Sequence, residues 1–596
     1  MDTQILTVLV ILALTVILLI LEVFRIDLVA ILCMLALGWT GILNPAETLS
    51  GFGSNAVIAM IAVMIMGTGI AHTGVMNRFS GAILRLAGGR RSRLLAMISL
   101  SAGLISAFMQ NVGAAALFLP AVLNISRRER IPASELIMPL GFAAILGGTL
   151  TMVASSPLIL LNDLLRNADL KPYGLFGVTP VGLILLGSGV LFFLFFGRRV
   201  LPRRPAGEAK ISEQMRLIDT WHLPHRICRY GIPTGSRLVG KTTEESGIWE
   251  RFGLHILAVS TESGIQYAPW RHTGFEAGQE LALLGDEQDI QRFADEFDLK
   301  FREALESFRD LTDPDSAGFS EILIPSESSL VGRTMRELSF RKKYAVEPLL
   351  FFSRDEEISG DFSDRKIRSG DTLVVHGLWD NLDRLKGDRD FVVVTPIEGS
   401  LKVRGKTPIA LLCFAGAIGL TMARLPISIS LFSGAVAMMV TGVIRIDEAY
   451  RAVEWKVVFL IAGLIPLGIA MQKTGTASFL ATRVMGVVQG QHPLMILLAV
   501  ALMSTVFSLF MSNVASTVVL APLVISIARM AALDPRPLVL LVAVCAANSF
   551  LLPTHQVNAM LMTPGGYRNR DYFRAGGGMT LLFVTVVVLL FYLMYI

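Results

Sequence analysis

Charged residues are scarce in this sequence of 596 residues. They make up 17% of it, whereas hydrophobic residues make up 53%. The mean hydropathy of +0.60 excludes an ordinary soluble globular domain and indicates a polytopic α-helical membrane protein. The net charge is only +5, and the arginines gather in short loops, so nucleic acid is not an expected partner.

Cysteine is also rare. The four cysteines, at 33, 228, 413 and 545, have neither disulfide nor metal-ligand spacing. The sequence shows no nucleophile–base pair, metal cluster or phosphate loop, so we expect neither an enzyme nor a cofactor. The first apolar run lacks the basic region and cleavage site of a signal peptide, and we expect it to remain as a membrane helix.

Charge density divides the chain into apolar ends and a charged middle. We expect a first transmembrane repeat at 1–202, cytosolic modules at 203–310 and 311–405, and a second transmembrane repeat at 406–596. Each repeat combines candidate spans with one longer, bipartite apolar segment, at 94–125 and 494–530. The spans are 4–21, 28–43, 55–77, 134–165 and 178–197, then 406–422, 427–444, 456–473, 537–563 and 576–596.

The bipartite segments carry matching motifs. "FMQNVGAAALFLP" begins at Phe108 and "FMSNVASTVVLAP" at Phe510, 402 positions later. "TGILNPAE" from Thr40 similarly matches "TGVIRIDE" from Thr441. Several pairs in one order, at a nearly constant offset, indicate an internal repeat.

Basic residues predict the topology, because Lys and Arg accumulate on the cytoplasmic side of a membrane. They flank segment 94–125 on both sides, so we expect a re-entrant hairpin with its tip at Gln110–Asn111. With five spans per repeat the second copy is inverted, and its hairpin tip, Ser512–Asn513, opens to the opposite side. Residues 203–405 are then cytoplasmic and both termini extracytoplasmic. The residues used are Arg78, Arg85, Arg90, Arg91, Arg93, Arg127, Arg128, Arg130, Arg198, Arg199, Arg203, Arg204, Arg568, Arg570 and Arg574.

Each hairpin is followed by a span that polar and helix-breaking residues interrupt: "GGTLTMVASSP" from Gly147 and "ANSFLLPTHQVN" from Ala547. We expect discontinuous helices, which are tolerated at membrane depth only beside protein or a water-filled cavity. In inverted-repeat transporters such elements meet near the midplane, where helix N-termini bind anions and freed carbonyls bind cations. An asparagine tip suits this chemistry, because its carbonyl can coordinate Na⁺ and its amide can donate to an oxyanion.

Acidic residues, lysine and arginine are absent from the centres of the spans. The acidic residues of the membrane parts, among them Asp163, fall at span ends or in loops, which argues against a proton or potassium antiporter. An anion would therefore be held by backbone N–H groups, polar side chains and co-bound Na⁺.

Each feature also has a purely structural interpretation. A polar pair can join helices, Gly147–Gly148 can permit close packing, and Pro120 and Pro522 can bend their helices. A lone histidine such as His555 more often has a structural function, with its hydrogen bonds made inside the protein, than a function as ligand.

At these residues the chain resembles the divalent anion/sodium symporter family, which carries dicarboxylates, tricarboxylates and sulfate. The family has a Ser-Asn-Thr-like signature at each hairpin tip and a broken helix after it. The resemblance implies that substrate and ions are bound by Gln110, Asn111, Val112, Thr149, Thr151, Ser155, Ser156, Ser512, Asn513, Val514, Asn548, Pro553, Thr554 and Asn558, with Na⁺ near Asn111 and Asn513.

The chain departs from the family signature in several places. Gln110 replaces the first serine, Val112 and Val514 replace the threonines, and Leu158 stands where an asparagine is expected. The segment "TPGGYRNRDYFRAG" from Thr563 resembles the corresponding loop of the sulfate-carrying branch, which favours sulfate.

The charged middle is itself duplicated. "GSRLVGKT" from Gly235 matches "ESSLVGRT" from Glu327, and Gly278 matches Gly370 at the same offset of 92. Both copies are expected to be small α+β modules. They resemble the TrkA C-terminal domain, a regulatory module that pairs with itself and in other transport systems binds small cytosolic ligands. A structural insert without a ligand is the alternative.

The sequence therefore predicts sodium-coupled symport of sulfate or a C4-dicarboxylate across the cell membrane by alternating access. The resemblance further implies a homodimer, with the cytosolic modules as regulators. A cation channel or antiporter gated by these modules, and a non-transporting anion sensor, are the alternatives.

Overall fold

The computed structural model separates into two units, Met1–Ala209 with Val403–Ile596, and Lys210–Lys402. The described residues are 2–21, 23–73, 91–129, 131–202, 213–221, 223, 226–262, 264–302, 306–312, 316–353, 356–358, 362–386, 388–395, 406–488 and 492–595. Of the arginines used to predict the topology, Arg78, Arg85, Arg90, Arg130, Arg203 and Arg204 lie outside these ranges.

The first unit is helical throughout its described part. Its first half comprises α1 (Thr3–Leu21), α2 (Ile26–Trp39), α3 (Pro45–Leu49), α4 (Asn55–His72), α6 (Arg91–Ser106), α7 (Asn111–Arg128), α8 (Ser134–Gly147), α9 (Ser156–Asn167) and α10 (Thr179–Val200). Its second half comprises α18 (Thr407–Met422), α19 (Ile427–Val440), α20 (Ile446–Ala452), α21 (Trp455–Lys473), α22 (Thr476–Val488), α23 (Pro493–Phe510), α24 (Asn513–Met530), α25 (Pro535–Cys545), α26 (Gln556–Met562) and α27 (Asn569–Tyr595).

Apolar surface identifies the helices that face lipid or another chain. Within the described residues, seven helices are long and apolar enough to cross a membrane. α1 exposes Leu6, Val10 and Leu14 by 51%, 58% and 55%, which no water-facing helix of a stable soluble protein would do as a continuous stripe. The first unit is thus the membrane domain of a multi-pass membrane protein.

The two bipartite segments are pairs of helices joined by short non-helical tips. α6 and α7 are connected by residues 107–110, and α23 and α24 by residues 511–512. The spans predicted at 134–165 and 537–563 are broken as expected, the first into α8 and α9 and the second into α25 and α26. The segment from Thr563 was expected to be a loop as far as Gly576, which is wrong, because α27 begins at Asn569 and includes Arg570 and Arg574.

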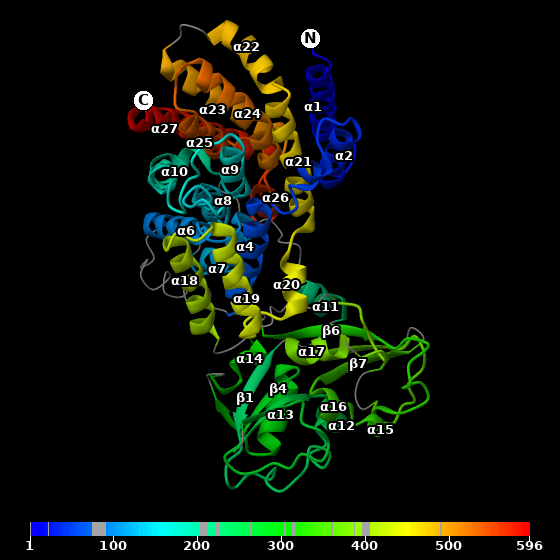
Figure 1. The fold of residues 1–596 in the computed structure, drawn as a ribbon. Coiled ribbons are helices and arrows are strands. Elements are labelled where there is room, and N and C mark those ends of the chain that lie inside the picture. The colour runs from blue at the N-terminus through cyan, green and yellow to red at the C-terminus, as the bar shows by residue number, and fades with distance from the viewer. Residues whose placement is uncertain are drawn as a thin grey trace. The chain divides into compact units, whose positions relative to one another are not determined.

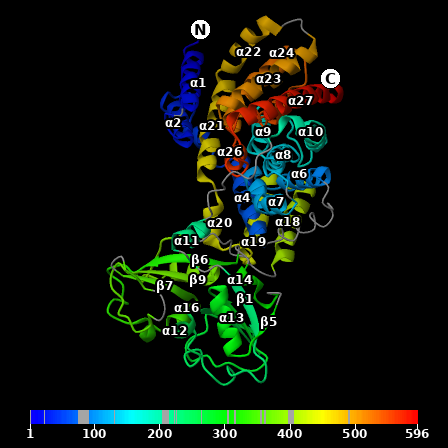
Figure 2. The same cartoon turned by 180° about the vertical axis from the view of Figure 1, so that it is seen from behind.

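Helices of the two halves intermix in this unit. α2 packs against α21, and α4 packs against α19, so first-half helices lie beside second-half helices (Figures 1 and 2). A second group contains α6, α7, α8 and α10 of the first half with α23, α24, α25 and α27 of the second. The contact of α10 with α27 joins the two halves in this group. Two helix groups therefore form, and each draws on both halves of the chain.

The second unit, which we call the insert, contains two five-stranded antiparallel sheets. One has the order β3-β2-β4-β1-β5, and the other β10-β6-β9-β7-β8. Its strands are β1 (Ile227–Gly231), β2 (His255–Thr261), β3 (Gly264–Tyr267), β4 (Glu280–Leu284), β5 (Lys300–Arg302), β6 (Ala317–Leu323), β7 (Glu347–Ser353), β8 (Glu356–Ile358), β9 (Thr372–Leu378) and β10 (Val392–Val393). Its helices are α11 (Glu213–Trp221), α12 (Ile248–Phe252), α13 (Glu287–Glu296), η1 (Glu306–Phe308), α14 (Arg309–Thr312), α15 (Met335–Leu338), α16 (Phe340–Tyr344) and α17 (Trp379–Lys386).

The two sheets have the same topology. Each strand of the first has its counterpart 92 positions later in the second, and the strand orders agree when one is reversed. The irregularities are repeated too: β2 bulges between Ile256 and Ala258, and β7 between Pro348 and Leu350. The sheets share a buried core, to which β2 contributes Leu257 and β7 contributes Leu349. We call residues 227–302 module 1 and residues 317–393 module 2.

Several contacts between the modules join a residue to its own counterpart. Glu347 accepts from His255 at 3.0 Å, and Glu244 accepts from Arg336 at 2.9 Å, and both pairs are 92 positions apart. A contact between equivalent residues lies on the twofold axis that relates two copies. The modules therefore pair about a pseudo-twofold axis, and the residues on the axis are chemically complementary instead of identical.

Glu347 anchors this axis inside the protein. Its side chain is 1% exposed and receives two hydrogen bonds from Arg341, at 2.7 and 3.0 Å, besides the contact with His255. Burial alone would raise the pKa of this carboxyl, but Arg341 and His255 together hold the pKa below its usual value. Glu347 is thus ionised, and its charge is compensated from both modules.

Reversing one axial charge should weaken the module pair. Glu244→Arg places two guanidinium groups on the axis, and we expect the first thermal transition of the full-length protein to fall by roughly 2–4 °C. Adding Arg336→Glu should restore most of this loss. Tryptophan fluorescence is a suitable readout, because Trp221, Trp249, Trp270 and Trp379 lie in the insert. Glu262→Arg makes the same charge change away from the axis and should have no such effect; an equal loss in both single variants would contradict the axial assignment.

Candidate substrate and ion site

The tip of the first hairpin is held by one serine. α6 ends at Ser106 and α7 begins at Asn111. Asn111 Oδ1 accepts from Ser106 Oγ at 2.8 Å, and the same hydroxyl lies 2.7 Å from the carbonyl oxygen of Ala144 on α8. Because a serine hydroxyl has one proton, it can serve only one of these two oxygens at a time. The carbonyl oxygen of Ala144 also accepts from the backbone N–H of Gly148 at 3.2 Å, so the hydroxyl of Ser106 can serve Asn111. The amide oxygen of Asn111 is a neutral oxygen of the kind that can bind Na⁺.

A glycine makes room for the amide of Asn111. A Cβ atom at Gly148 would come within 2.6 Å of Asn111 Oδ1 and 2.8 Å of its Nδ2. Gly147 serves packing instead, because a Cβ there would lie 2.1 Å from the carbonyl oxygen of Gly103 on α6. The two neighbouring glycines thus have different functions, and Gly148 brings the first break into contact with the first tip.

The second tip has the same asparagine but a different cap. Ser512 accepts at its side chain from the backbone N–H of Ala515 at 3.2 Å and so caps α24. Gln110, at the matching position of α7, makes no such side-chain bond. Asn513 Oδ1 accepts from Ser549 Oγ at 3.2 Å, so here the serine comes from the broken helix. The exchange of serine for glutamine therefore leaves the start of α7 without the cap that α24 has.

The hydroxyl groups of the first break have unequal environments. Thr149 donates to the carbonyl oxygen of Leu146, and Thr151 donates to that of Ala107 in the first tip. Within the described part of the chain, the only hydrogen-bond partner of the Ser156 hydroxyl is the sulfur of Met60, at 3.8 Å. Ser155 Oγ is buried and has no hydrogen-bond partner among the described residues. Thr149 and Thr151 are committed to backbone oxygens, whereas Ser155 is available to a ligand.

The second break is organised by two asparagines. Asn548 donates to Thr505 Oγ1 at 3.1 Å and accepts from Thr580 Oγ1 at 3.2 Å. Asn558 donates to the carbonyl oxygen of Ser549 at 2.8 Å, but its Oδ1 is buried and has no partner within the described chain. An orphaned carbonyl oxygen at a buried position is costly unless something binds it, so Asn558 is the stronger ligand candidate of the two.

Four other residues named by the resemblance make no polar side-chain contact with any residue that the structure describes. Val514 is 5% exposed and lies in the apolar core, and Val112 packs against that core. Pro553 is half-buried and Thr554 is exposed in the turn before α26. These positions can contribute backbone groups, but the valines cannot replace the missing threonine hydroxyls.

Half-helices from each repeat reach into the other. α9, which follows the first break, packs on α24 and α25 of the second half. α26, which follows the second break, packs on α7 and α8 of the first half. The helices that begin at the tips, α7 and α24, therefore each contact the broken helices of both repeats. This arrangement brings the two sets of candidate residues into one region of the helical unit.

His555 has a structural function. Its Nδ1 accepts from the backbone N–H of Val557 at 3.2 Å, so it caps α26. This contact favours the structural interpretation of this histidine over a function as ligand.

A carboxylate is buried where the sequence predicted only span ends and loops. Asp163 lies inside α9 and is 6% exposed, which corrects that expectation. It accepts from the backbone N–H of Ala56, in the first turn of α4, at 2.7 Å, and from Arg166 at 2.9 Å. Asp163 also borders a cavity of about 300 Å³ that Asn55 and Ser428 line. Because its oxygens are paired within the protein, Asp163 joins α9 to α4 and is not a free exchange site.

Sequence reasoning missed the serines and threonines that hold the asparagines. Ser106, Ser549, Thr505 and Thr580 all donate to or accept from a site asparagine. A single hydroxyl in an apolar run usually bonds to its own helix, so nothing in the sequence distinguished these four.

The comparison with protein families decides the broad class. The family model described as "Citrate transporter" matches residues 16–545 and 487–596. The chain belongs to this family. Its members are transporters of the divalent anion/sodium symporter type, in agreement with the resemblance seen in the sequence.

Two relatives match the chain over nearly its full length. The uncharacterized transporter sll0640 of Synechocystis is 30% identical over 100% of this chain and 98% of its own. The uncharacterized transporter YfbS of Escherichia coli is 28% identical over 95% of each chain. Sodium/sulfate cotransporter 1 of Chlamydomonas reinhardtii is 22% identical over 61% of this chain and 44% of its own.

Among solved structures, the GsuK RCK domain covers 27% of this chain and 62% of its own at 12% identity, with a TM-score of 0.13.

A methyl group at Gly148 should displace the amide of Asn111. We expect Gly148→Ala to reduce anion uptake at least tenfold, since the added carbon would overlap the side chain that the site depends on. Gly187→Ala in α10 is the matched control, because a Cβ there meets no atom within 4 Å. Uptake by purified, reconstituted variants measures the effect; normal uptake by Gly148→Ala would show that the position of Asn111 is not critical.

Proposed function

We propose that this protein is a sodium-coupled symporter that imports a small divalent anion, sulfate or a C4-dicarboxylate, by alternating access. The observation that carries the proposal is the duplicated tip. Asn111 and Asn513 each begin a helix, each accept a serine hydroxyl at Oδ1, and each lie against a broken helix. Family membership supports transport, and the names of the sodium/sulfate and sodium-dependent dicarboxylate relatives support the ion and the substrate class.

Sodium would be bound by neutral oxygens. Na⁺ is a hard cation, and the amide oxygens of Asn111 and Asn513 are suitable ligands together with carbonyl oxygens freed at the breaks. The proposed set around the tips and breaks is Gln110, Asn111, Val112, Thr149, Thr151, Ser155, Ser156, Ser512, Asn513, Val514, Asn548, Pro553, Thr554 and Asn558. Within it, Ser155 and Asn558 carry the unpartnered oxygens.

The anion would be bound without a fixed positive charge. Residues 148–155 and 546–555 contain no lysine or arginine. Helix N-termini supply partial positive charge, and α7 and α24 both begin at the tips. Two such ends cannot neutralise a dianion, so co-bound Na⁺ supplies the remaining charge. This requirement explains why the proposal is symport.

The proposed topology follows the basic residues. The two halves form inverted repeats of five spans, the hairpins α6–α7 and α23–α24 are re-entrant from opposite sides, and both termini are extracytoplasmic. The group with α2, α4, α19 and α21 would serve as the scaffold and dimer interface, against which the hairpin-bearing group moves. The insert would be cytoplasmic, its modules similar to TrkA C-terminal domains and regulatory.

Uptake into proteoliposomes tests the proposal directly. Labelled sulfate, succinate and citrate are offered with an inward Na⁺ gradient, with a K⁺ gradient, and with none. We expect uptake of at least one dianion that depends on the Na⁺ gradient. Na⁺ or K⁺ flux without any anion would support a channel or antiporter, and binding without uptake would support a sensor; either result contradicts the symporter.

The tips are tested separately. We expect Asn111→Ala and Asn513→Ala each to lower the uptake rate at least tenfold, since each removes one amide oxygen from the site. Asn569→Ala, at the exposed start of α27, is the control and should transport normally. Size-exclusion profiles show whether the variants fold. Near-normal uptake by both tip variants would show that the asparagines only pack the hairpins.

A further inference from the structure

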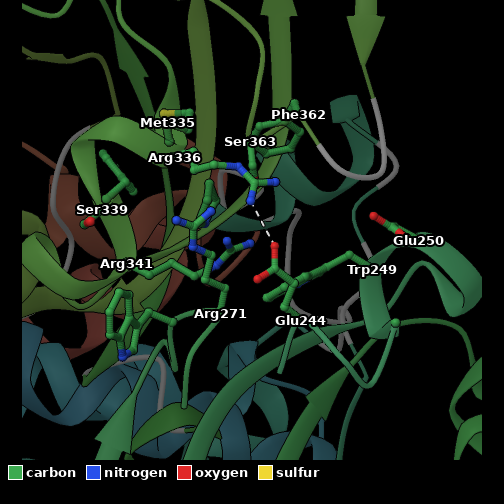
Figure 3. A pocket seen from close by; sticks show the side chains of 14 residues that line it. Glu244, Trp249, Glu250, Arg271, Met335, Arg336, Ser339, Arg341, Phe362 and Ser363 are labelled. Atoms are coloured by element: carbon green, nitrogen blue, oxygen red, sulfur yellow. Dashed lines mark hydrogen bonds and ion pairs between the residues drawn. The ribbon is translucent and has the colours of Figure 1, made fainter. Parts of the chain in front are cut away.

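A pocket lies on the pseudo-twofold axis of the insert. The space between its lining residues measures about 680 Å³ and opens to solvent. Module 1 contributes Glu244, Trp249 and Arg271, and module 2 contributes Arg336 and Arg341. Figure 3 shows these side chains around one hollow, which Glu250 of module 1 also lines.

Most charges around the pocket are already paired. Arg336 donates to Glu244 at 2.9 Å and to Asp364 at 2.8 Å. Arg341 is held by Glu347, and its guanidinium also lies 4.4 Å from the ring centre of Trp249. Arg271 is different, because its side chain has no hydrogen bond or ion pair to any described residue. Its free guanidinium can bind an anion, whereas the guanidinium groups of Arg336 and Arg341 are already paired with carboxylates.

Aromatic residues form another part of the lining. Trp249, Trp270, Phe340 and Phe362 all border the pocket. The Nε1 of Trp249 is buried and has no partner in the described chain, so this ring carries an unused donor. Aromatic faces bind planar rings by stacking, and apolar walls favour an organic ligand over a bare inorganic ion.

The pocket is not symmetric, although it lies on the axis. Trp249 in module 1 corresponds to Arg341 in module 2, and Arg271 corresponds to Ser363, at the offset of 92. The uncommitted cation is therefore present once. A ligand with one anionic group fits this arrangement better than a symmetric ligand with one at each end.

We propose that this pocket binds a small organic molecule in which one anionic group is attached to a planar ring. The anionic group binds Arg271 and Arg336, replacing part of the Glu244 contact, and the ring lies between the indoles of Trp249 and Trp270. Because the ligand contacts both modules, its binding strengthens their pairing. This site is separate from the proposed transport site and does not depend on it.

Calorimetric titration of the purified full-length protein tests the site without measuring transport. The probes are phenyl phosphate, adenosine 5′-monophosphate and indole-3-acetate, which combine a ring with an anion. Inorganic phosphate lacks the ring, and adenosine lacks the anion. We expect at least one ring-bearing anion to bind with a Kd under about 1 mM and at least tenfold tighter than both inorganic phosphate and adenosine.

Arg271 is the residue to change. Arg271→Ala should weaken binding of that probe roughly tenfold, the usual effect of losing one charge-assisted hydrogen bond, and Arg271→Lys should retain part of it. Arg237→Ala, an exposed arginine of module 1 outside the pocket, should bind normally. The proposal is overturned if none of the three probes binds, if inorganic phosphate or adenosine binds as tightly as the best of them, or if Arg271→Ala binds unchanged.

Discussion

The helical unit is constrained above all by the backbone groups that its broken helices expose. Lipid offers no hydrogen bonds, so every N–H and C=O freed at the two breaks needs a partner inside the protein. At the first break, Thr151 donates to Ala107, Thr179 donates to Leu150, and the N–H of Met152 donates to Leu175. At the second, Asn558 donates to Ser549. These contacts fix where the tips and half-helices lie.

The same constraint places binding groups in the interior. Side chains that bond to the backbone of a broken helix must come from a neighbouring element. In each half a serine of the hairpin can donate to a carbonyl oxygen of the broken helix: Ser106 to Ala144, and Ser504 to Val542. These two bonds span the same 38 residues in each half. Among the buried atoms that have no partner in the described residues, the oxygens of Ser155 and Asn558 lie at the breaks, where the repeats interlock. The same arrangement thus provides hydrogen-bond partners for the broken helices and leaves oxygens that can bind a ligand.

Much of this arrangement was visible in the sequence, and the rest depends on distant contacts. The tips were predictable because a polar pair followed by an apolar run marks the start of a helix, and α7 and α24 do begin at Asn111 and Asn513. The burial of Asp163 was not, because it depends on Ala56 of α4, 107 positions earlier. The extension of α27 to Asn569 was hidden by the charged and glycine-rich composition of that segment. The offset of 92 revealed two modules, but it could not show which faces pair.

The complementary pairs on the pseudo-twofold axis influence which modules pair with each other. If two copies of module 1 or of module 2 met about the same axis, Glu244 would face Glu244, Arg336 would face Arg336, and the buried Glu347 would face Glu347. A Glu347 pair would be buried and therefore strongly unfavourable, whereas pairs of Glu244 or of Arg336 would be partly exposed and would cost less. The axial charges therefore favour pairing of module 1 with module 2, most strongly over pairing of two copies of module 2. Each chain then contributes one module pair, and one axial pocket, for any number of chains that assemble in the membrane.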